Sequence, residues 1–354
     1  MRRLTAALAV ALLTLFAAAG PMLACGGLIG PNGAVNLLRT TTFAGYHDGV
    51  EHYLTAFQFA GGGGKFGSII PLPGIPTSVV RGGDWTLQRL VRETTPVREF
   101  FAADSAVPAA SGPGVTVILQ TKVDALDITV LSGGGADVGA WATDHGFRLP
   151  PDAPEVLDFY ASRSPIFLAA SFDADAAKAR GQQIGDGTPV HITIPTDNPW
   201  VPLRILGLGK IADEQVSADV FLMTDHRPTL LPNPINRGLR LDYDQPASDS
   251  LLGDLRADKG MDWVPSSAWL TKIGIDVKAS TLTYDLAVDA SGHGRPSFVA
   301  AGLGTAASAS EFSIGIRDPS VVVAWIPGIL VIVGGVLFIG WLMRRRPASG
   351  GRAA

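Results

Sequence analysis

The chain has one cysteine among its 354 residues, Cys25. A single cysteine excludes an intrachain disulfide and a zinc site built from several thiolates. An excess of basic residues is also missing, because 28 Lys and Arg stand against 32 Asp and Glu, for a formal charge of −4. Nucleic acids and anionic lipid surfaces attract basic proteins. The composition therefore predicts that nucleic acid is not a partner.

Motifs of known chemistry are missing as well. The sequence has no GxSxG, no HExxH, no phosphate-binding loop that ends in lysine, and no GxGxxG at the start of an expected helix. The glycine run at 61–64 lacks the strand-loop-helix context of a phosphate site and is interpreted as a loop. We expect no cofactor, name no catalytic residue and do not assign the chain to an enzyme class.

Charged residues are absent from 321–343, which reads VVVAWIPGILVIVGGVLFIGWLM. At 1.5 Å per residue a helix of this length crosses about 30 Å of hydrocarbon. Three arginines follow at 344–346, and basic residues next to a span favour the cytoplasmic side. The sequence thus predicts a single transmembrane helix, a cytoplasmic tail over 344–354, and a cell-membrane protein whose N-terminal domain is extracytoplasmic.

The N-terminal residues 1–24 are typical of a secretory signal peptide, with Arg2 and Arg3 before a short apolar run and small residues toward the end. Cys25 follows Ala24 directly, and this leaves two readings open. It is either a site of lipidation or an ordinary residue beside a signal-peptidase cut.

Between the two ends, residues 25–290 are expected to form an extracytoplasmic domain of the α+β class, rich in antiparallel sheet and with a few short helices. This length suits either one large domain or two subdomains that divide near 104–114 or near 228–250, and both of these segments are expected to be loops. A stalk rich in Gly, Ala and Ser is expected over 291–320. Residues 25–318, between the signal and the anchor, hold 22 basic and 32 acidic residues, for a formal charge of −10.

The clearest local pattern is a hairpin within residues 35–59. Two segments rich in Thr, Phe, Tyr and Val flank Asp48-Gly49, a dipeptide favoured in two-residue turns. Further strands are expected over 115–120, 125–131, 165–172, 190–194, 201–208 and 216–223, and a second hairpin from 269–277 and 280–288. Helices are expected over 85–94, 137–145, 154–162 and 251–256.

The hairpin also carries the candidate metal ligands. With a two-residue turn, His47 and His52 lie on one face at diagonal positions, about 7–8 Å apart at Cα, and could converge on one ion. Asp48 or Glu51 would have to supply oxygen to that ion. Glu51 points to the opposite face in this register, which weakens the metal prediction. The alternative is an ordinary solvated hairpin tip.

Several segments are similar to one bacterial family. These are a signal that ends near Cys-Gly, a Pro-Asn-Gly turn, and the stretches LLRTTTFAGYHDGVEHYLTAFQF, GSIIPLPGIP, WATDHGFRLPPDAPEVLDFY and NPWVPLRILGLG. Across most of residues 25–290 the chain resembles exported proteins of the domain-of-unknown-function family numbered 2330. The resemblance implies an exported bacterial protein, often membrane-tethered, with no assigned activity and hence no catalytic residues to transfer.

Three functions remain open on the sequence. The first is a cell-envelope binding or interaction module, with an envelope protein or polymer as partner. The second is an envelope hydrolase whose acidic and histidine groups meet only in the fold. The third is a metal-dependent sensor or accessory protein that uses His47 and His52.

Overall fold

The structure is a computed structural model, and it describes residues 27–30, 33–34, 40–58, 65–94, 116–182, 187–290 and 294–304. Its chain divides into a unit of residues 1–303 and a unit of residues 304–354. The expected signal peptide, Cys25 and the apolar segment 321–343 lie outside the described residues. Within the described ranges, no helix combines the length and the apolar character needed to cross a bilayer.

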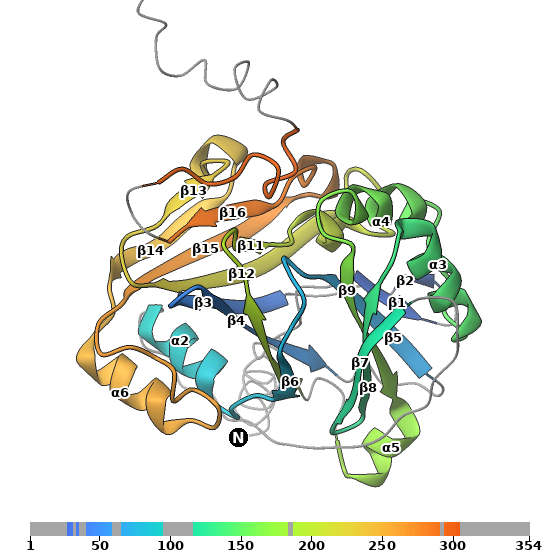
Figure 1. Ribbon diagram of the computed structural model, residues 1–354, viewed down its shortest axis with the longest axis horizontal. Coiled ribbons are helices and arrows are strands. Elements are labelled where there is room, and N and C mark those ends of the chain that lie inside the picture. The colour runs from blue at the N-terminus through green and yellow to red at the C-terminus, as the bar shows by residue number, and fades with distance from the viewer. Residues whose placement is uncertain are drawn as a thin grey trace, which may run out of the picture. The chain divides into compact units, whose positions relative to one another are not determined.

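A seven-stranded sheet forms the centre of the first unit (Figure 1). All neighbours in it are antiparallel except the central pair β12–β3, which is parallel. Its strands in spatial order are β14 (Arg240–Pro246), β15 (Trp269–Lys278), β12 (Gln215–Thr224), β3 (Thr40–His47), β4 (Val50–Gln58), β10 (Gly187–Pro195) and β6 (Ser78–Arg81).

The other strands form a six-stranded antiparallel sheet and a small three-stranded sheet. The six strands in order are β2 (Gly33–Ala34), β1 (Gly27–Gly30), β5 (Lys65–Pro71), β9 (Ile166–Asp173), β8 (Leu126–Ser132) and β7 (Thr116–Val123). The three-stranded sheet has the order β11 (Trp200–Val201), β16 (Leu286–Asp289) and β13 (Thr229–Leu231).

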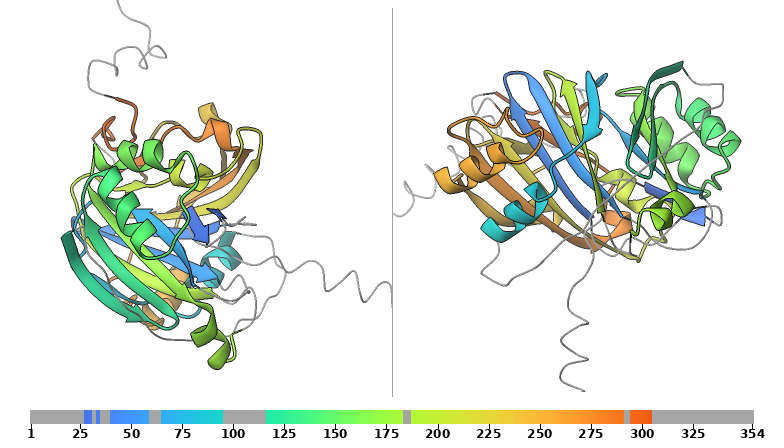
Figure 2. Two further views of the ribbon diagram at one scale, coloured as in Figure 1. Left: turned by 90° about the vertical axis from the view of Figure 1, so that its right-hand side faces the viewer. Right: turned by 90° about the horizontal axis from the view of Figure 1, so that it is seen from below.

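The two large sheets share the main hydrophobic core, which joins side chains such as Tyr53 and Ile192 of one sheet to Ile70 and Leu168 of the other. Helices cover the outer faces. Figure 2 shows one helix pair beside each large sheet, α2 with α6 and α3 with α4. The helices are α2 (Thr86–Thr94), α3 (Gly135–Asp144), α4 (Ala153–Ala161), α5 (Ala174–Ala179) and α6 (Asp249–Ala257).

This architecture confirms the expected α+β class with antiparallel sheets and few helices. The hairpin prediction is confirmed in its turn as well as in its strands. Asp48 and Gly49 have φ values of 49° and 76°, and two positive values define the turn type whose twist suits a hairpin.

Three local predictions were wrong. Residues 201–208 form the end of β11 and a 3₁₀ turn at Arg204–Gly207, not a strand. The segment 228–250, expected to be a loop, contains β13 and β14. The second hairpin does not form, because β15 pairs with β12 and β14 whereas β16 joins the three-stranded sheet. In the second and third cases the strands pair with partners farther along the chain, which the local pattern does not indicate.

The domain extends past residue 290. Ala300 and Ala301 are buried, and the amide of Asp285 donates to the carbonyl of Ala301 at 2.9 Å. Residues 294–303, placed at the start of the stalk by sequence, therefore pack against the domain.

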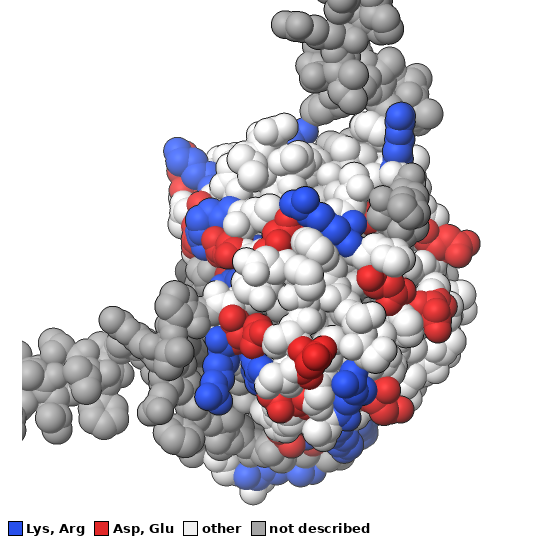
Figure 3. Space-filling model, turned by 90° about the vertical axis from the view of Figure 1, so that its left-hand side faces the viewer, with Lys and Arg blue, Asp and Glu red and all other residues white. Residues whose placement is uncertain are grey.

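Charges of both signs alternate on the side of the molecule shown in Figure 3. Many of them are paired across the surface. Arg89 bonds Glu93 and Asp254, both at 2.7 Å, and Arg240 bonds Asp242 at 3.1 Å. A more exposed pair such as Arg240–Asp242 contributes little stability, about 0–1 kcal/mol. This side presents a mixed surface instead of a patch of one sign.

Candidate functional site

The β3–β4 hairpin has the register expected from its turn. Gly45 faces His52 and His47 faces Val50 across the two strands. Because side chains alternate along a strand, His47 and His52 lie on one face of the sheet and Glu51 on the other. The two faces have different surroundings.

His47 is held by acidic groups. Its Nδ1 lies 2.7 Å from Oδ1 of Asp225, and its Nε2 lies 3.5 Å from Oδ2 of Asp48. Asp225 directly follows β12, so the parallel β3–β12 pair brings it to the hairpin tip. Of the other two predicted metal ligands, Asp48 lies near His47, whereas His52 does not contact it. Asp225, which the sequence did not indicate, lies closer to His47 than Asp48 does.

His52 contacts a second histidine and a tryptophan instead. Its Nδ1 lies 3.1 Å from Nε2 of His191 on β10, so one ring donates a hydrogen bond to the other. The His52 ring also stacks on Trp263, with centroids 3.8 Å apart and planes within 3°. Trp263 lies over Gly45, where a Cβ atom would come within 2.1 Å of the indole. The glycine is thus needed for this close approach.

Both histidines of this pair favour the neutral form. Burial lowers the pKa of His52 to about 3, and the positive charges that His191 and His47 would carry act in the same direction. Burial also lowers the pKa of His191 to about 4, against a smaller opposing effect of Asp262. At neutral pH the pair carries no charge and keeps its hydrogen bond.

The predicted metal ligands are not brought together into one cluster. In the described part of the chain, no group of three or more His, Cys, Asp or Glu side chains is placed to hold an ion. His47 and His52 each have their own partners. A site with His47, His52 and Asp48 stays a prediction, which zinc or copper binding by the protein and by a His47→Ala/His52→Ala variant would test.

Around these histidines lies a partly open sheet surface, here called the histidine face. Farther along the same strands this side is covered by α2 and α6, whose Leu87, Leu90 and Leu251 pack on Phe43 and Leu54. Toward the hairpin tip the side chains stay at least partly exposed, with Val80 of the edge strand β6 at 46%. The histidine face comprises His47, Val50, His52, Ser78, Val80, Thr193 and Pro195.

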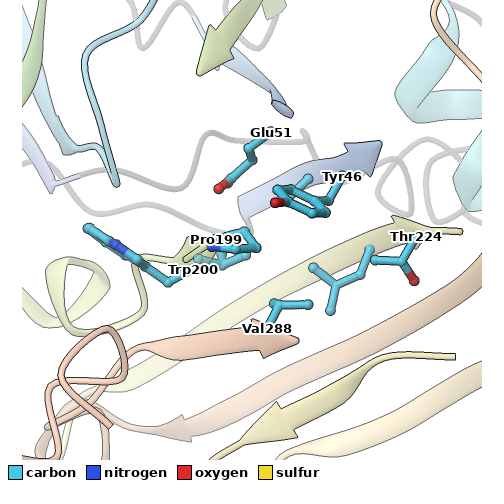
Figure 4. Close-up of a pocket in the computed structure, with 9 residues that line it drawn as sticks. Tyr46, Glu51, Pro199, Trp200, Thr224 and Val288 are labelled. Atoms are coloured by element: carbon cyan, nitrogen blue, oxygen red, sulfur yellow. The ribbon is translucent and has the colours of Figure 1, made fainter. Parts of the chain in front are cut away.

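On the opposite face, Glu51 points into a small cavity at the end of the inter-sheet core. The cavity measures about 10 Å³, close to the space that one water molecule needs. In Figure 4 the Glu51 carboxyl and the Tyr46 hydroxyl both point into the space beside Pro199. The lining residues are Ala44, Tyr46, Glu51, Pro199, Trp200, Val201, Leu222, Thr224 and Val288.

Glu51 is 1% exposed. Within the described ranges neither carboxyl oxygen has a hydrogen bond of full geometry, although the backbone of Trp200 lies near enough to stabilise the ionised form. Burial raises the pKa of Glu51 to about 8, and the nearby backbone of Trp200 lowers it by a smaller amount. Tyr46 lines the same cavity, and its hydroxyl donates a hydrogen bond to the carbonyl of Thr196 at 2.8 Å.

Asp285 shows what a fully partnered buried acid looks like in the same domain. It is 0% exposed and accepts hydrogen bonds from the amides of Leu203 and Arg204, the hydroxyl of Tyr160 and the guanidinium of Arg163, at 2.5–3.0 Å. These contacts fasten α4 to the segment after β11. Asp285 is a structural group, whereas Glu51 has no such role visible in its contacts.

Sequence reasoning identified His47, His52 and the opposite orientation of Glu51, but missed His191, Trp263 and Asp225 as their neighbours. Each of these lies more than 130 residues away from its partner in sequence. An alternating strand pattern around His191 indicated which side of its strand it occupies, but nothing in the sequence paired β10 with β4.

Comparison with known proteins gives a family. Residues 19–288 match the model of an uncharacterized protein family conserved in bacteria, DUF2330, and the chain belongs to it. No curated protein matches the chain. Two crystal structures of baculovirus P35, one of a mutant after caspase cleavage, have 8% and 6% identity and a TM-score of 0.37. Each match covers 71% of this chain and 96% or 98% of P35. A TM-score that low carries no functional argument.

Proposed function

We propose that this DUF2330 member is an exported protein of the bacterial cell envelope, anchored by one membrane helix, whose extracytoplasmic domain binds a partner through the histidine face. Export and anchoring are supported by the signal-like residues 1–24, the charge-free run 321–343 and the three arginines that follow it. The partner is an envelope protein or polymer.

The observation that carries the binding role is the incomplete cover of one sheet face. Four adjacent strands, β3, β4, β10 and β6, have described side chains that are at least partly exposed there, although α2 and α6 pack on Phe43, Leu54 and Phe221 farther along the same face. The surface combines imidazoles, the hydroxyls of Ser78 and Thr193, and apolar groups such as Val80. Interfaces commonly combine apolar and aromatic groups with a few hydrogen-bonding ones.

The location is tested by fusions to alkaline phosphatase, which is active only outside the cytoplasm. A fusion after residue 304 should be active and a fusion after Arg346 inactive. The reverse result would contradict the orientation. Mass spectrometry of the mature N-terminus would show whether Cys25 is acylated, free or removed.

The binding surface is tested by a photo-crosslinking residue placed at position 80 of the full chain in intact cells. The matched control is position 211, because Ile211 is 74% exposed and precedes β12 at the end opposite the hairpin tip. We expect a crosslinked species of defined mass from position 80 and none from position 211. Equal crosslinking from both positions, or none from position 80, would contradict a binding role for this face.

A further inference from the structure

The last described residues, 294–304, are fastened to the domain beside α4. The guanidinium of Arg163, two residues after α4, donates to the carbonyl of Ala300 at 2.6 Å. Gly302 lies so close to Phe159 of α4 that a Cβ atom would come within 2.2 Å of the ring. These contacts fix the point at which the chain leaves the domain.

Only a short stretch of sequence separates this point from the predicted membrane helix. Residues 305–320 lie before the charge-free run 321–343. A coil of that length has a root-mean-square span of about 20–24 Å, whereas a domain of this size is about 50 Å across. A helix inserted over 321–343 would therefore keep the side that carries residues 294–304 close to the bilayer.

Two large apolar side chains are exposed on that side. Val299 is 49% exposed and directly precedes the buried Ala300. Ile235 is 64% exposed and begins the 3₁₀ turn Ile235–Arg237, between β13 and β14. Both views, Figure 1 and the left panel of Figure 2, show the yellow loop after β13 and the orange-red residues 294–304 at the upper side of the domain.

Contacts inside the domain join the two loops. The guanidinium of Arg237 lies over the ring of Tyr284, 5.0 Å from its centroid. Tyr284 directly precedes Asp285, whose amide donates to the carbonyl of Ala301 at 2.9 Å. The turn that carries Ile235 and the segment that carries Val299 are thus held by neighbouring residues of one buried stretch.

We propose that this side of the domain, around Ile235 and Val299, lies on the outer surface of the bilayer that the C-terminal helix crosses, with both side chains inserted at the lipid headgroups. The proposal rests on the membrane anchor of the proposed function. Single exposed apolar side chains are common on protein surfaces, but these two lie on the side that the short connection keeps near lipid. A weak contact is sufficient there, because the connection holds the surface at a high effective concentration beside the bilayer.

Such a contact has a consequence for the binding role. A domain that only hangs on its connection can turn freely, whereas a domain that rests on lipid presents the histidine face in one orientation to its envelope partner. The contact is apolar, so it should form on neutral lipid as well as on anionic lipid.

The test places a photo-crosslinking residue at position 235 of the full chain in phosphatidylcholine nanodiscs and detects lipid adducts by mass spectrometry. The matched control is position 75. Ile75 is 56% exposed and precedes β6, whereas Ile235 precedes β14, at the opposite edge of the same sheet. We expect about tenfold more lipid adduct from position 235 than from position 75. Equal yields, or no adduct from position 235, would overturn the proposal.

A second measurement tests whether the two side chains form one surface. With the photo-crosslinking residue at position 299, Ile235→Asp should lower the yield of lipid adduct about fivefold, because a charged group replaces an inserted apolar one. Ile75→Asp should leave the yield unchanged. An equal yield in Ile235→Asp and in the otherwise unchanged chain would also overturn the proposal.

Migration of the chain with the nanodiscs separates this proposal from the anchor. A chain that migrates with the nanodiscs but forms no adduct at position 235 would contradict the lipid contact alone. A chain that does not migrate with them would contradict the anchor and the lipid contact together.

Discussion

The two faces of strand β4 give their ionisable side chains different surroundings. On one face, His52 bonds His191 and stacks on Trp263 at the border of an open surface. On the other face, Glu51 is 1% exposed, lies at the wall of a small cavity and has the Trp200 backbone beside its carboxyl group. Neighbouring residues of one strand thus place a half-exposed base with two ring partners next to a fully buried acid.

The two faces are expected to respond to pH in opposite ways. Burial keeps both groups neutral near pH 7, but it shifts their pKa values in opposite directions. Ionisation of Glu51 at high pH and protonation of the histidine pair at low pH both disfavour the folded state. The stability of the domain should therefore be greatest between the two limits.

The largest expected effect comes from Glu51→Gln. The pKa of Glu51 is about 8 in the fold and 4.5 in the unfolded chain. The folded state thus holds a proton that the unfolded state has lost, and the wild type loses stability as the pH rises from 4.5 to 8. The loss is on the order of 3–5 kcal/mol. Urea unfolding across this pH range should show the decline in the wild type and a much flatter curve in Glu51→Gln.

The histidine pair should change the free energy of unfolding with pH in the opposite direction. The pKa of His191 is about 4 in the fold and 6.5 in the unfolded chain, so the unfolded state takes up a proton first as the pH falls. The wild type should lose roughly 2–3 kcal/mol between pH 6.5 and 4 from this group. His191→Gln should lack that loss in the same unfolding series. If His191→Gln lost as much stability as the wild type between pH 6.5 and 4, His191 would not be the cause of that loss.

Packing on the histidine side is tested by Gly45→Ala. The new Cβ would lie 2.1 Å from the Trp263 ring, so the indole must move off His52, at a cost of about 1–3 kcal/mol. Urea unfolding gives the cost, and NMR titration should show the pKa of His52 rising toward 6.5. Gly253→Ala is the control, because nothing lies within 4 Å of its Cβ. An equal loss in both variants would contradict a specific role for the close approach.

The smallest effect on stability is expected from Val80→Lys. Val80 is 46% exposed on an edge strand, where lysine is well tolerated. The free energy of unfolding should change by less than about 0.5 kcal/mol. A larger loss would show that Val80 belongs to the core and not to a binding surface.

The sequence contained most of the local information about this site. Asp48-Gly49 predicted the hairpin turn, and the turn fixed the register that separates His47 and His52 from Glu51. Residues 216–223 alternate in a way that is typical of a strand with one exposed side, yet the residues of β12 from Ala218 onward are all buried. The reason is cover by α2 and α6, which come from distant parts of the chain.

The long-range pairings were beyond a single sequence. The parallel β3–β12 pair brings Asp225 to His47, and the β4–β10 pair brings His191 to His52. Each depends on which of several similar apolar strands become neighbours, and local periodicity does not encode that choice. The burial of Glu51 has the same origin, because β11 and β16 supply the walls of its cavity.

The central claim is that the histidine face acts as one binding surface. The most direct test combines a crosslinking residue on one of its strands with a substitution on another. A photo-crosslinking residue at position 195 on β10 is compared in wild-type cells and in cells that carry Val80→Lys on β6, with Ile211→Lys as the control. We predict one crosslinked species in the wild type, its loss in Val80→Lys and its retention in Ile211→Lys. Retention of the same species in Val80→Lys would contradict the claim.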